Sequence, residues 1–293
     1  MLILISDAFD KSLPEKLSVF GEVTEDKSRL AEADVVLIRS KTKANREYLE
    51  SAKNLKLIIR GGVGMDNIDR EYCKEKGIIA TNTPKSSAIA VAELAMALML
   101  SVPNNLVFYD TTTKKGEWQK NVKRTELSGK TLALLGFGNI ARQVAVRAKA
   151  FGMRVIAYDK YVTSSDLAEL VDLDTAVKEA DYISMHLPYT PETDKLLNKE
   201  LIAKMGKKPV VINTGRGKCV DEAAVAEALA DGSISWFCSD VYSSEPVKED
   251  NPLYTAKNIT LTPHVGANTK ENLLRIGQEV VDTISSLIKE GKI

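Results

Sequence analysis

The stretch KTLALLGFGNIARQVAVRAKAFGMRVIAYDK, residues 130–160, decides the fold of this chain. It opens with an apolar run, turns at Gly136-Phe137-Gly138 and continues with apolar residues at helical spacing up to Gly152. A second apolar run then ends at Asp159, about 20 residues beyond the turn. This order predicts a βαβ unit of the Rossmann type: a strand, a G-x-G-x-x-A turn, a helix and a second strand that ends in an acid.

The chemistry of this turn favours a dinucleotide. Gly136 permits the tight turn, Gly138 lets the backbone approach a pyrophosphate, and Ala141 keeps helix and strand close. The helix amino terminus offers N–H groups and a positive dipole end to the phosphates. Asp159 can accept hydrogen bonds from a ribose 2′-hydroxyl and would repel a 2′-phosphate, which predicts NAD as the cofactor in preference to NADP. The alternative is a turn whose glycines serve packing alone.

The rest of the chain alternates apolar β-branched runs with helical stretches, as parallel sheets wrapped by helices do. Strand candidates in the first third are 2–6, 35–39, 55–60 and 77–82. A more regular series starts near Thr131, Arg154, Asp181, Pro209, Ser235 and Asn258. The spacing of these starts fits one strand plus one crossover each, so the sequence predicts a doubly wound α/β sheet.

Two helices stand out. Residues 88–100, AIAVAELAMALML, are apolar on most of the circumference, which predicts a helix buried between domains or against a partner subunit. From Thr269 onward, apolar residues recur at helical spacing and predict a terminal helix that packs back on the first domain. Those residues are Leu273, Ile276, Val280, Ile284, Leu287 and Ile288.

Composition bounds the class of protein. A chain of 293 residues exceeds what one core usually serves, so two domains are expected. Forty Lys and Arg cancel forty Asp and Glu, which argues against a nucleic-acid partner. The longest apolar stretch, 88–102, falls short of the ~20 residues that span a bilayer, and the amino terminus has no basic leader. We therefore expect no membrane partner and, with three cysteines in no close pair, a cytoplasmic protein.

Three polar residues follow predicted strands of the second series and are candidates for the chemistry. His264 lies in PHVGANT, Arg216 in INTGRGK and Glu245 in SDVYSSEP. The carboxyl ends of strands line the ligand crevice of an open α/β sheet, so a base, a guanidinium and a carboxylate meet at one rim. Taken singly, each residue has an ordinary structural alternative as a packing or turn residue. His186, the only other histidine, is the weaker candidate, and no metal-ligand spacing is present.

These segments together resemble the D-isomer-specific 2-hydroxyacid dehydrogenases over essentially the whole chain. The markers, in the family's order, are GGVGMDNID, AVAELAMALML, GFGNIA, HLPYTPET, INTGRG, SDVYSSEP and PHVGANT. Within the family, RSKTK, GGVGMDNID, TNTP and PHVGANTKEN are most similar to D-3-phosphoglycerate dehydrogenases. The resemblance implies that Arg216, Glu245 and His264 are the catalytic set.

The same resemblance implies two doubly wound parallel-sheet domains. A Rossmann NAD-binding domain, 93–267, would be inserted in a flavodoxin-like substrate domain made of 1–92 and 268–293. It also implies a homodimer and cofactor contacts on both domains. The cofactor residues would be Val63, Gly136, Gly138, Asn139, Ile140, Asp159, Leu187, Pro188, Thr214, Gly215, Asp240, Gly266 and Ala267.

The expected substrate is a small 2-hydroxy or 2-oxo acid. Arg216 would hold its carboxylate, and the backbone of Gly61, Gly62, Val63 and Gly64 could form an anion-binding concavity. Arg39 and Arg60 each end an apolar strand of the first domain, and a guanidinium suits phosphate geometry. Since the matching residues of phosphoglycerate dehydrogenases contact the substrate phosphate, the resemblance predicts 3-phosphoglycerate or 3-phosphohydroxypyruvate and a place in serine biosynthesis.

Two departures and two alternatives accompany this prediction. Asn139 stands where many relatives carry Arg, and the sequence ends at Ile293, so we expect no carboxy-terminal regulatory domain. The alternative substrate is glyoxylate or hydroxypyruvate. An alternative of another class is an NAD(H)-sensing binding protein like the family's corepressors, which an exposed partner groove or basic, disordered extensions would favour.

Overall fold

The computed structural model describes residues 1–293 and divides into two compact units. Unit 1 comprises Met1–Ala88 together with Ala267–Ile293, and unit 2 comprises Ile89–Gly266. The resemblance predicts these divisions at 92/93 and 267/268, so the observed boundaries differ from the prediction by four residues and by one. The chain therefore leaves unit 1 once and returns to it for its last helix.

Unit 1 contains a five-stranded parallel sheet in the order β2-β1-β3-β4-β5. The strands are β1 (Leu2–Ile5), β2 (Glu22–Thr24), β3 (Val35–Ile38), β4 (Leu57–Arg60) and β5 (Ile79–Asn82). This is the flavodoxin-like order. The three central strands are buried along nearly their whole length, which explains their continuous apolar sequences.

Helices cover both faces of that sheet. α1 (Leu13–Leu17) and α10 (Lys270–Lys289) pack on one face, α10 through Ile276, Val280 and Ile284. α2 (Arg46–Ser51) and α3 (Arg70–Glu75) pack on the other face. The short 3-10 turns η1 (Ser18–Phe20) and η2 (Lys27–Glu32) flank β2. The terminal helix thus packs on the first domain, as its apolar spacing predicts.

Unit 2 contains a seven-stranded parallel sheet in the order β12-β11-β10-β9-β6-β7-β8. The strands are β6 (Thr131–Leu135), β7 (Arg154–Tyr158), β8 (Glu169–Leu170), β9 (Tyr182–Met185), β10 (Val210–Asn213), β11 (Trp236–Ser239) and β12 (Ile259–Leu261). The chain runs outward from β6 to β8 and then resumes on the other side of β6 with β9. This reversal is the switch point at which doubly wound sheets bind ligands, and the predicted fold class is confirmed.

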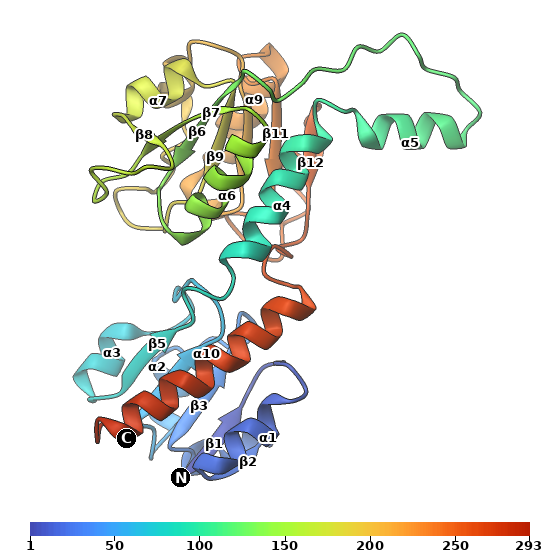
Figure 1. Ribbon diagram of the computed structural model, residues 1–293. Coiled ribbons are helices and arrows are strands. Elements are labelled where there is room, and N and C mark those ends of the chain that lie inside the picture. The colour runs from blue at the N-terminus through green and yellow to red at the C-terminus, as the bar shows by residue number, and fades with distance from the viewer. The chain divides into compact units, whose positions relative to one another are not determined.

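The helices of unit 2 also form two layers (Figure 1). α4 (Ala88–Ser101) and α6 (Asn139–Ala150) cover one face, whereas α7 (Leu173–Glu179), α8 (Lys199–Ala203) and α9 (Glu222–Asp231) cover the other. The turns η3 (Gly217–Cys219) and η4 (Pro252–Tyr254) lie in loops. α5 (Leu106–Lys114) and the segment after it extend away from the sheet in Figure 1.

The apolar helix α4 is largely buried within unit 2 itself. Ala92, Ala95, Met96 and Met99 belong to the core that it shares with α6 and the sheet. Its apolar circumference therefore needs no partner subunit to explain it. No single helix is long and apolar enough to cross a membrane; α4 and α5 would pass together by length and composition, but they are bent by 61°.

Candidate active site

The glycine turn after β6 is open on its outer side. Gly136 has a φ of +88°, and a Cβ there would lie 2.9 Å from the His186 carbonyl oxygen, so only glycine fits. Gly138 is the N-cap of α6, and a Cβ on it would meet no atom within 4 Å. Asn139 and Ile140 then form the first turn of the helix. An open space against a helix amino terminus suits a pyrophosphate, so the residues present fit a dinucleotide.

Asp159 lies at the end of β7, beside this turn. Its carboxylate accepts hydrogen bonds from the backbone N–H groups of Phe137 at 2.7 Å, Tyr161 at 2.8 Å and Val162 at 3.0 Å. Burial alone would raise the pKa of Asp159, but these three amides outweigh it and lower the pKa. The carboxylate is therefore charged, and its bond to Phe137 N–H holds the glycine turn in place. It lies at the position where the sequence predicts an acceptor for the ribose hydroxyl.

His264 and Glu245 form a hydrogen-bonded pair on the far side of the same sheet edge. His264 Nδ1 lies 2.6 Å from Glu245 Oε2, and Glu245 Oε1 accepts the Tyr242 N–H at 3.1 Å. Both side chains stay accessible, at 40% for His264 and 37% for Glu245. Burial would raise the pKa of Glu245, but the bond to His264 and the nearby charges lower it. A carboxylate on Nδ1 leaves Nε2 for a substrate.

Arg216 follows β10, and its positive charge contributes to the lowered pKa of Glu245. Its Nη1 donates to the Gly215 carbonyl at 2.8 Å. The next residue, Gly217, packs so tightly on the loop after β11 that an added Cβ would lie 1.9 Å from the Tyr242 carbonyl carbon. This close approach joins the two loops that carry Arg216 and Glu245, so the structure brings all three predicted catalytic residues to one edge.

The contacts that hold His264 in place were not predicted from the sequence. Its φ of +55° is in the left-handed region, which non-glycine residues adopt only where their surroundings require it. Asp240, buried after β11, accepts from Thr262 Oγ1 at 2.5 Å, Val265 N at 2.9 Å and Gly266 N at 2.8 Å. The Tyr242 hydroxyl donates to the Thr262 carbonyl at 2.8 Å. The resemblance predicts Asp240 as a cofactor residue; the structure shows that it anchors the loop of His264.

The remaining predicted cofactor residues of unit 2 lie at the ends of β9 and β10. Gly215 packs closely on the segment that follows β9, because a Cβ added to it would lie 3.2 Å from the Leu187 carbonyl oxygen. The Pro188 carbonyl accepts the Thr193 hydroxyl at 2.7 Å. Thr214 is buried, and its hydroxyl has no hydrogen-bond partner.

Apart from Arg216, the predicted substrate residues belong to unit 1, as does the predicted cofactor residue Ala267. Register pairs Ile38 of β3 with Arg60 of β4, so Arg39 and Arg60 end neighbouring strands. Arg39 Nη1 donates to the Ala8 carbonyl at 3.2 Å, and burial lowers the pKa of its guanidinium. Arg60 lies against the Gly61–Gly64 loop, because a Cβ on Gly62 would come within 2.2 Å of its Nη1. The Gly62 N–H donates to the Thr83 hydroxyl at 2.7 Å, so this amide is engaged within unit 1.

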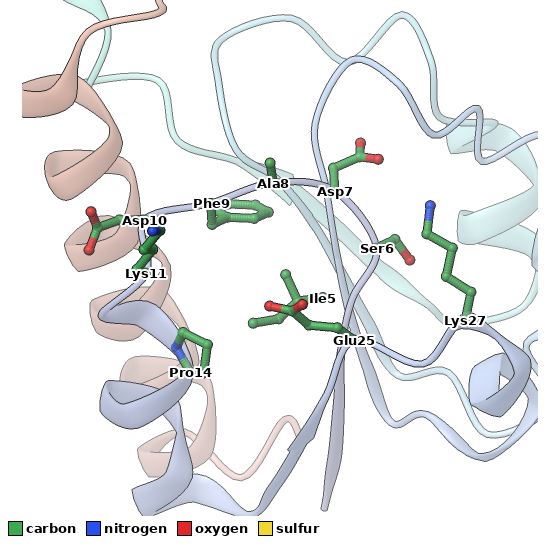
Figure 2. A pocket seen from close by; sticks show the side chains of 10 residues that line it. All are labelled: Ile5, Ser6, Asp7, Ala8, Phe9, Asp10, Lys11, Pro14, Glu25 and Lys27. Atoms are coloured by element: carbon green, nitrogen blue, oxygen red, sulfur yellow. The ribbon is translucent and has the colours of Figure 1, made fainter.

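A pocket of about 450 Å³ opens beside this strand edge, between the residues after β1 and those after β2 (Figure 2). Asp7 forms part of its wall and accepts hydrogen bonds from Arg39 N at 2.6 Å and from the Thr42 N–H and hydroxyl. Burial would raise the pKa of Asp7, but these bonds and the charge of Lys27, which extends toward it in Figure 2, lower it. Asp7 thus fixes the backbone from which Arg39 projects.

The doubly wound sheet, the open glycine turn with its acid, and a histidine–carboxylate pair define a class, the dinucleotide-binding α/β oxidoreductases. Residues 96–266 match the family model "D-isomer specific 2-hydroxyacid dehydrogenase, NAD binding domain". The chain belongs to the D-isomer-specific 2-hydroxyacid dehydrogenases; it is an oxidoreductase and its cofactor is NAD.

Individual relatives carry several names. A hydroxypyruvate reductase of Thermotoga maritima is 43% identical over 96% of both chains. A D-3-phosphoglycerate dehydrogenase of Methanocaldococcus jannaschii is 42% identical over 98% of this chain and 57% of its own, so the present chain spans little more than half of that relative. Among solved structures, D-lactate dehydrogenase of Aquifex aeolicus, complexed with NAD and lactic acid, has a TM-score of 0.87 at 30% identity and covers 100% of this chain and 97% of its own.

Proposed function

We propose that the enzyme interconverts 3-phosphoglycerate and 3-phosphohydroxypyruvate, with Arg216, Glu245 and His264 as its catalytic residues. The observation that carries the reaction is the 2.6 Å bond between His264 Nδ1 and Glu245 Oε2, with the positive charge of Arg216 nearby. This arrangement supplies a base with an accessible second nitrogen and a cation for the substrate carboxylate.

In the proposed reaction, NAD held by the glycine turn and Asp159 would supply the hydride acceptor for C2 of the hydroxy acid. Arg216 binds the α-carboxylate through two hydrogen bonds and polarises the C2 oxygen. His264 Nε2 takes the proton of the C2 hydroxyl during oxidation and returns it during reduction. Glu245 keeps the proton on Nδ1 in the resting state and stabilises the imidazolium that forms, while Asp240 and Tyr242 hold the loop that carries the ring.

For the substrate, the support is the pair of guanidinium groups on neighbouring strand ends. Unit 2 offers Arg216 for one anion, and unit 1 offers Arg39 and Arg60 for a second. A three-carbon acid with a terminal phosphate carries two such anions.

Hydroxypyruvate or glyoxylate is the second candidate substrate. The Thermotoga maritima relative, which matches this chain over nearly its whole length, is named a hydroxypyruvate reductase. The engagement of Arg39 with Ala8 also favours this candidate, because an arginine that serves the backbone is less available to a phosphate.

A substrate panel and one variant decide between the two. Initial rates of NADH oxidation at 340 nm are compared for 3-phosphohydroxypyruvate, hydroxypyruvate and glyoxylate. Replacing Arg60 by Ala should raise KM for the phosphorylated acid by roughly 10- to 100-fold, and KM for the others less than threefold. Arg46→Ala, an exposed arginine of the same unit, serves as the control. Equal losses on all three acids, or a wild type that prefers glyoxylate, would overturn the phosphate proposal and leave the dehydrogenase class intact.

We also propose a cytoplasmic homodimer that acts in serine biosynthesis. The α5 arm, residues 104–124, exposes Leu106, Val107, Phe108, Trp118 and Val122, and side chains of this kind usually become covered. The three cysteines are buried and form no disulfide, which suits a reducing compartment. In sedimentation velocity the wild type should be a dimer, and Val107→Lys should dissociate at higher protein concentration. A wild type that is monomeric at micromolar concentration would contradict the proposed dimer.

A further inference from the structure

A crevice within unit 1 separates the segments that follow the neighbouring strands β1 and β2. The chain leaves β1 for α1, whose Leu13 and Leu17 pack on one face of the sheet, and leaves β2 for η2, whose Leu30 packs on the other face. Connections that diverge to opposite faces leave a space between them at the carboxyl ends of the strands, where α/β sheets bind ligands. The pocket of about 450 Å³ in Figure 2 lies in this space, and its volume suits a small molecule.

Part of the lining of this crevice is apolar. Ile5, at the end of β1, is 4% exposed, and Pro14 lies in the first turn of α1. The ring of Phe9, from the segment between them, borders the same space in Figure 2. An apolar lining that includes an aromatic ring favours a ligand with an apolar body.

Two acids at the rim of the crevice already serve the fold. Asp7 accepts hydrogen bonds from the Arg39 N–H and from the N–H and hydroxyl of Thr42. Asp10 accepts the Ser12 N–H at 2.9 Å and also the Ser12 hydroxyl, within the turn that leads into α1. Both carboxylates therefore have donors from the chain itself, and a ligand has to be recognised by other groups.

Three further charged side chains at the rim have no partner in the chain. Glu25, Lys11 and Lys27 are exposed, and their side chains form no hydrogen bond or ion pair. In Figure 2 the Glu25 carboxylate extends inward, and the two lysines lie on opposite sides of the pocket. A simple anion bound here would meet the charge of Glu25, and a simple cation would meet the charges of both lysines. A ligand that carries both charges avoids these repulsions.

We propose that this crevice binds a small zwitterion, an α-amino acid with an apolar side chain. Its ammonium group pairs with Glu25 and its carboxylate with Lys27, while its side chain packs on the Phe9 ring. Asp26, between the two charged residues, has an extended backbone, which places side chains two residues apart on the same side of the chain. The two charges that the protein offers are therefore close together, as the two charges of an α-amino acid are.

The crevice also contacts two segments of unit 1 that are expected to bind substrate. The Ala8 carbonyl accepts Arg39 Nη1 at 3.2 Å, and a Cβ added to Gly61 would lie 2.6 Å from Phe9 Cε1. A ligand that packs on Phe9 therefore restrains the segment against which Arg39 and Gly61 lie. Binding in the crevice and binding of the 2-oxo acid should then change each other's affinity by the same factor. This coupling rests on the proposed substrate role of Arg39 and Gly61, whereas the binding of the zwitterion does not.

Isothermal titration calorimetry of the full chain with three matched probes tests the charge requirement. L-Phenylalanine carries both charges, 3-phenylpropionate carries only the carboxylate, and 2-phenylethylamine carries only the ammonium group. We expect saturable binding of L-phenylalanine and a Kd roughly three- to tenfold higher for each of the other two probes, because each lacks one ion pair.

Two variants locate the site. Glu25→Gln should raise the Kd for L-phenylalanine roughly three- to tenfold but should not weaken 3-phenylpropionate, because a repulsive charge is removed. Lys27→Met should weaken L-phenylalanine and 3-phenylpropionate by a similar factor and should not weaken 2-phenylethylamine. Glu50→Gln and Lys53→Met, which change exposed charges elsewhere in unit 1, are the matched controls and should leave all three Kd values unchanged.

Two results would overturn the binding site. One is the absence of saturable binding of L-phenylalanine up to about 10 mM. The other is equal affinity for the three probes that neither Glu25→Gln nor Lys27→Met changes, which would indicate apolar adsorption without recognition of charge.

The coupling is measured by the KM for the 2-oxo acid that the wild type reduces best. Saturating L-phenylalanine should change this KM at least about threefold in the wild type, and the same concentration should change it less in Lys27→Met. A constant KM while L-phenylalanine binds would overturn the coupling. The titrations contain no 2-oxo acid, so a wild type that does not prefer the phosphorylated acid would refute the proposed substrate and leave the binding results standing.

Discussion

The two histidines of this chain occupy the same edge of the same sheet in opposite environments. The ring of His264 is 40% exposed and bonded to the carboxylate of Glu245, whereas His186 meets a serine hydroxyl and has a buried Nδ1. A histidine exchanges protons near neutral pH only where its charged form is stabilised or solvated. The loop after β12 thus presents an accessible ring with a carboxylate partner, whereas the end of β9 holds a buried and neutral one.

The largest expected difference between the two histidines is in turnover. Replacing His264 by Ala should lower kcat by roughly 10²- to 10⁴-fold, the range for loss of a general acid–base group, with little change in the Kd for NADH. His186→Asn should retain most of the turnover. Stopped-flow and steady-state rates check this expectation, and normal turnover by His264→Ala would show that another group moves the proton.

The acid sensitivity of the fold should depend on His186. The unfolded chain binds a proton there below about pH 6.5, whereas the folded chain resists until about pH 4, so this residue destabilises the fold as pH falls between these values. The full effect is about 3 kcal/mol of the free energy of unfolding. Urea unfolding of wild type and His186→Phe at pH 7 and pH 4.5 measures it. If the free energy of unfolding of the variant fell equally steeply between pH 7 and pH 4.5, the His186 ring would not be neutral in the folded protein.

Asp159 ends β7, on the other side of β6 from His264, and its contacts are charged where those of His186 are neutral. Asp159→Ser removes the charge that repels a 2′-phosphate, so the ratio of kcat/KM for NADP to that for NAD should rise tenfold or more. Affinity for both cofactors should also fall, because the amides of Phe137, Tyr161 and Val162 lose a charged acceptor. A wild type that already prefers NADP would contradict this role.

The smallest effect is expected for Tyr242, which supports the loop of His264 from a distance. Tyr242→Phe removes the hydroxyl bond to the Thr262 carbonyl but keeps the backbone N–H that Glu245 accepts. The loss of one such bond predicts a three- to tenfold decrease in kcat with unchanged KM for NADH. A loss as large as that of His264→Ala would mean that the hydroxyl contacts the reacting groups directly.

Most strands of both sheets could be predicted from sequence, because a strand buried on both faces must be apolar throughout. The exceptions are β2 and β8, two of the four edge strands. Glu22–Thr24 and Glu169–Leu170 have three and two residues, are only partly buried, and carry no apolar run to detect. α5 was missed for a related reason, since its sequence LVFYDTTTK keeps several apolar side chains exposed and shows no buried face.

The site was only partly predictable. The Rossmann turn, Asp159 and the set Arg216, Glu245 and His264 follow from motifs that precede or follow a strand. Asp240 and Tyr242 could not be assigned their contacts to residues 262–266, because those contacts depend on where β12 returns beside β11. The unused nitrogen of His186 and hydroxyl of Thr214 likewise depend on the register between two strands.

The α/β class, the dinucleotide turn and the residue types at the carboxyl edge follow from the sequence alone, because they depend on local periodicity and on glycines at fixed spacing. Which histidine is accessible and paired with a carboxylate, and which is buried and neutral, depends on the tertiary structure. That difference arises from desolvation and from partners that lie far away in the chain, such as Glu245 for His264, and neither is encoded in the residues next to a histidine.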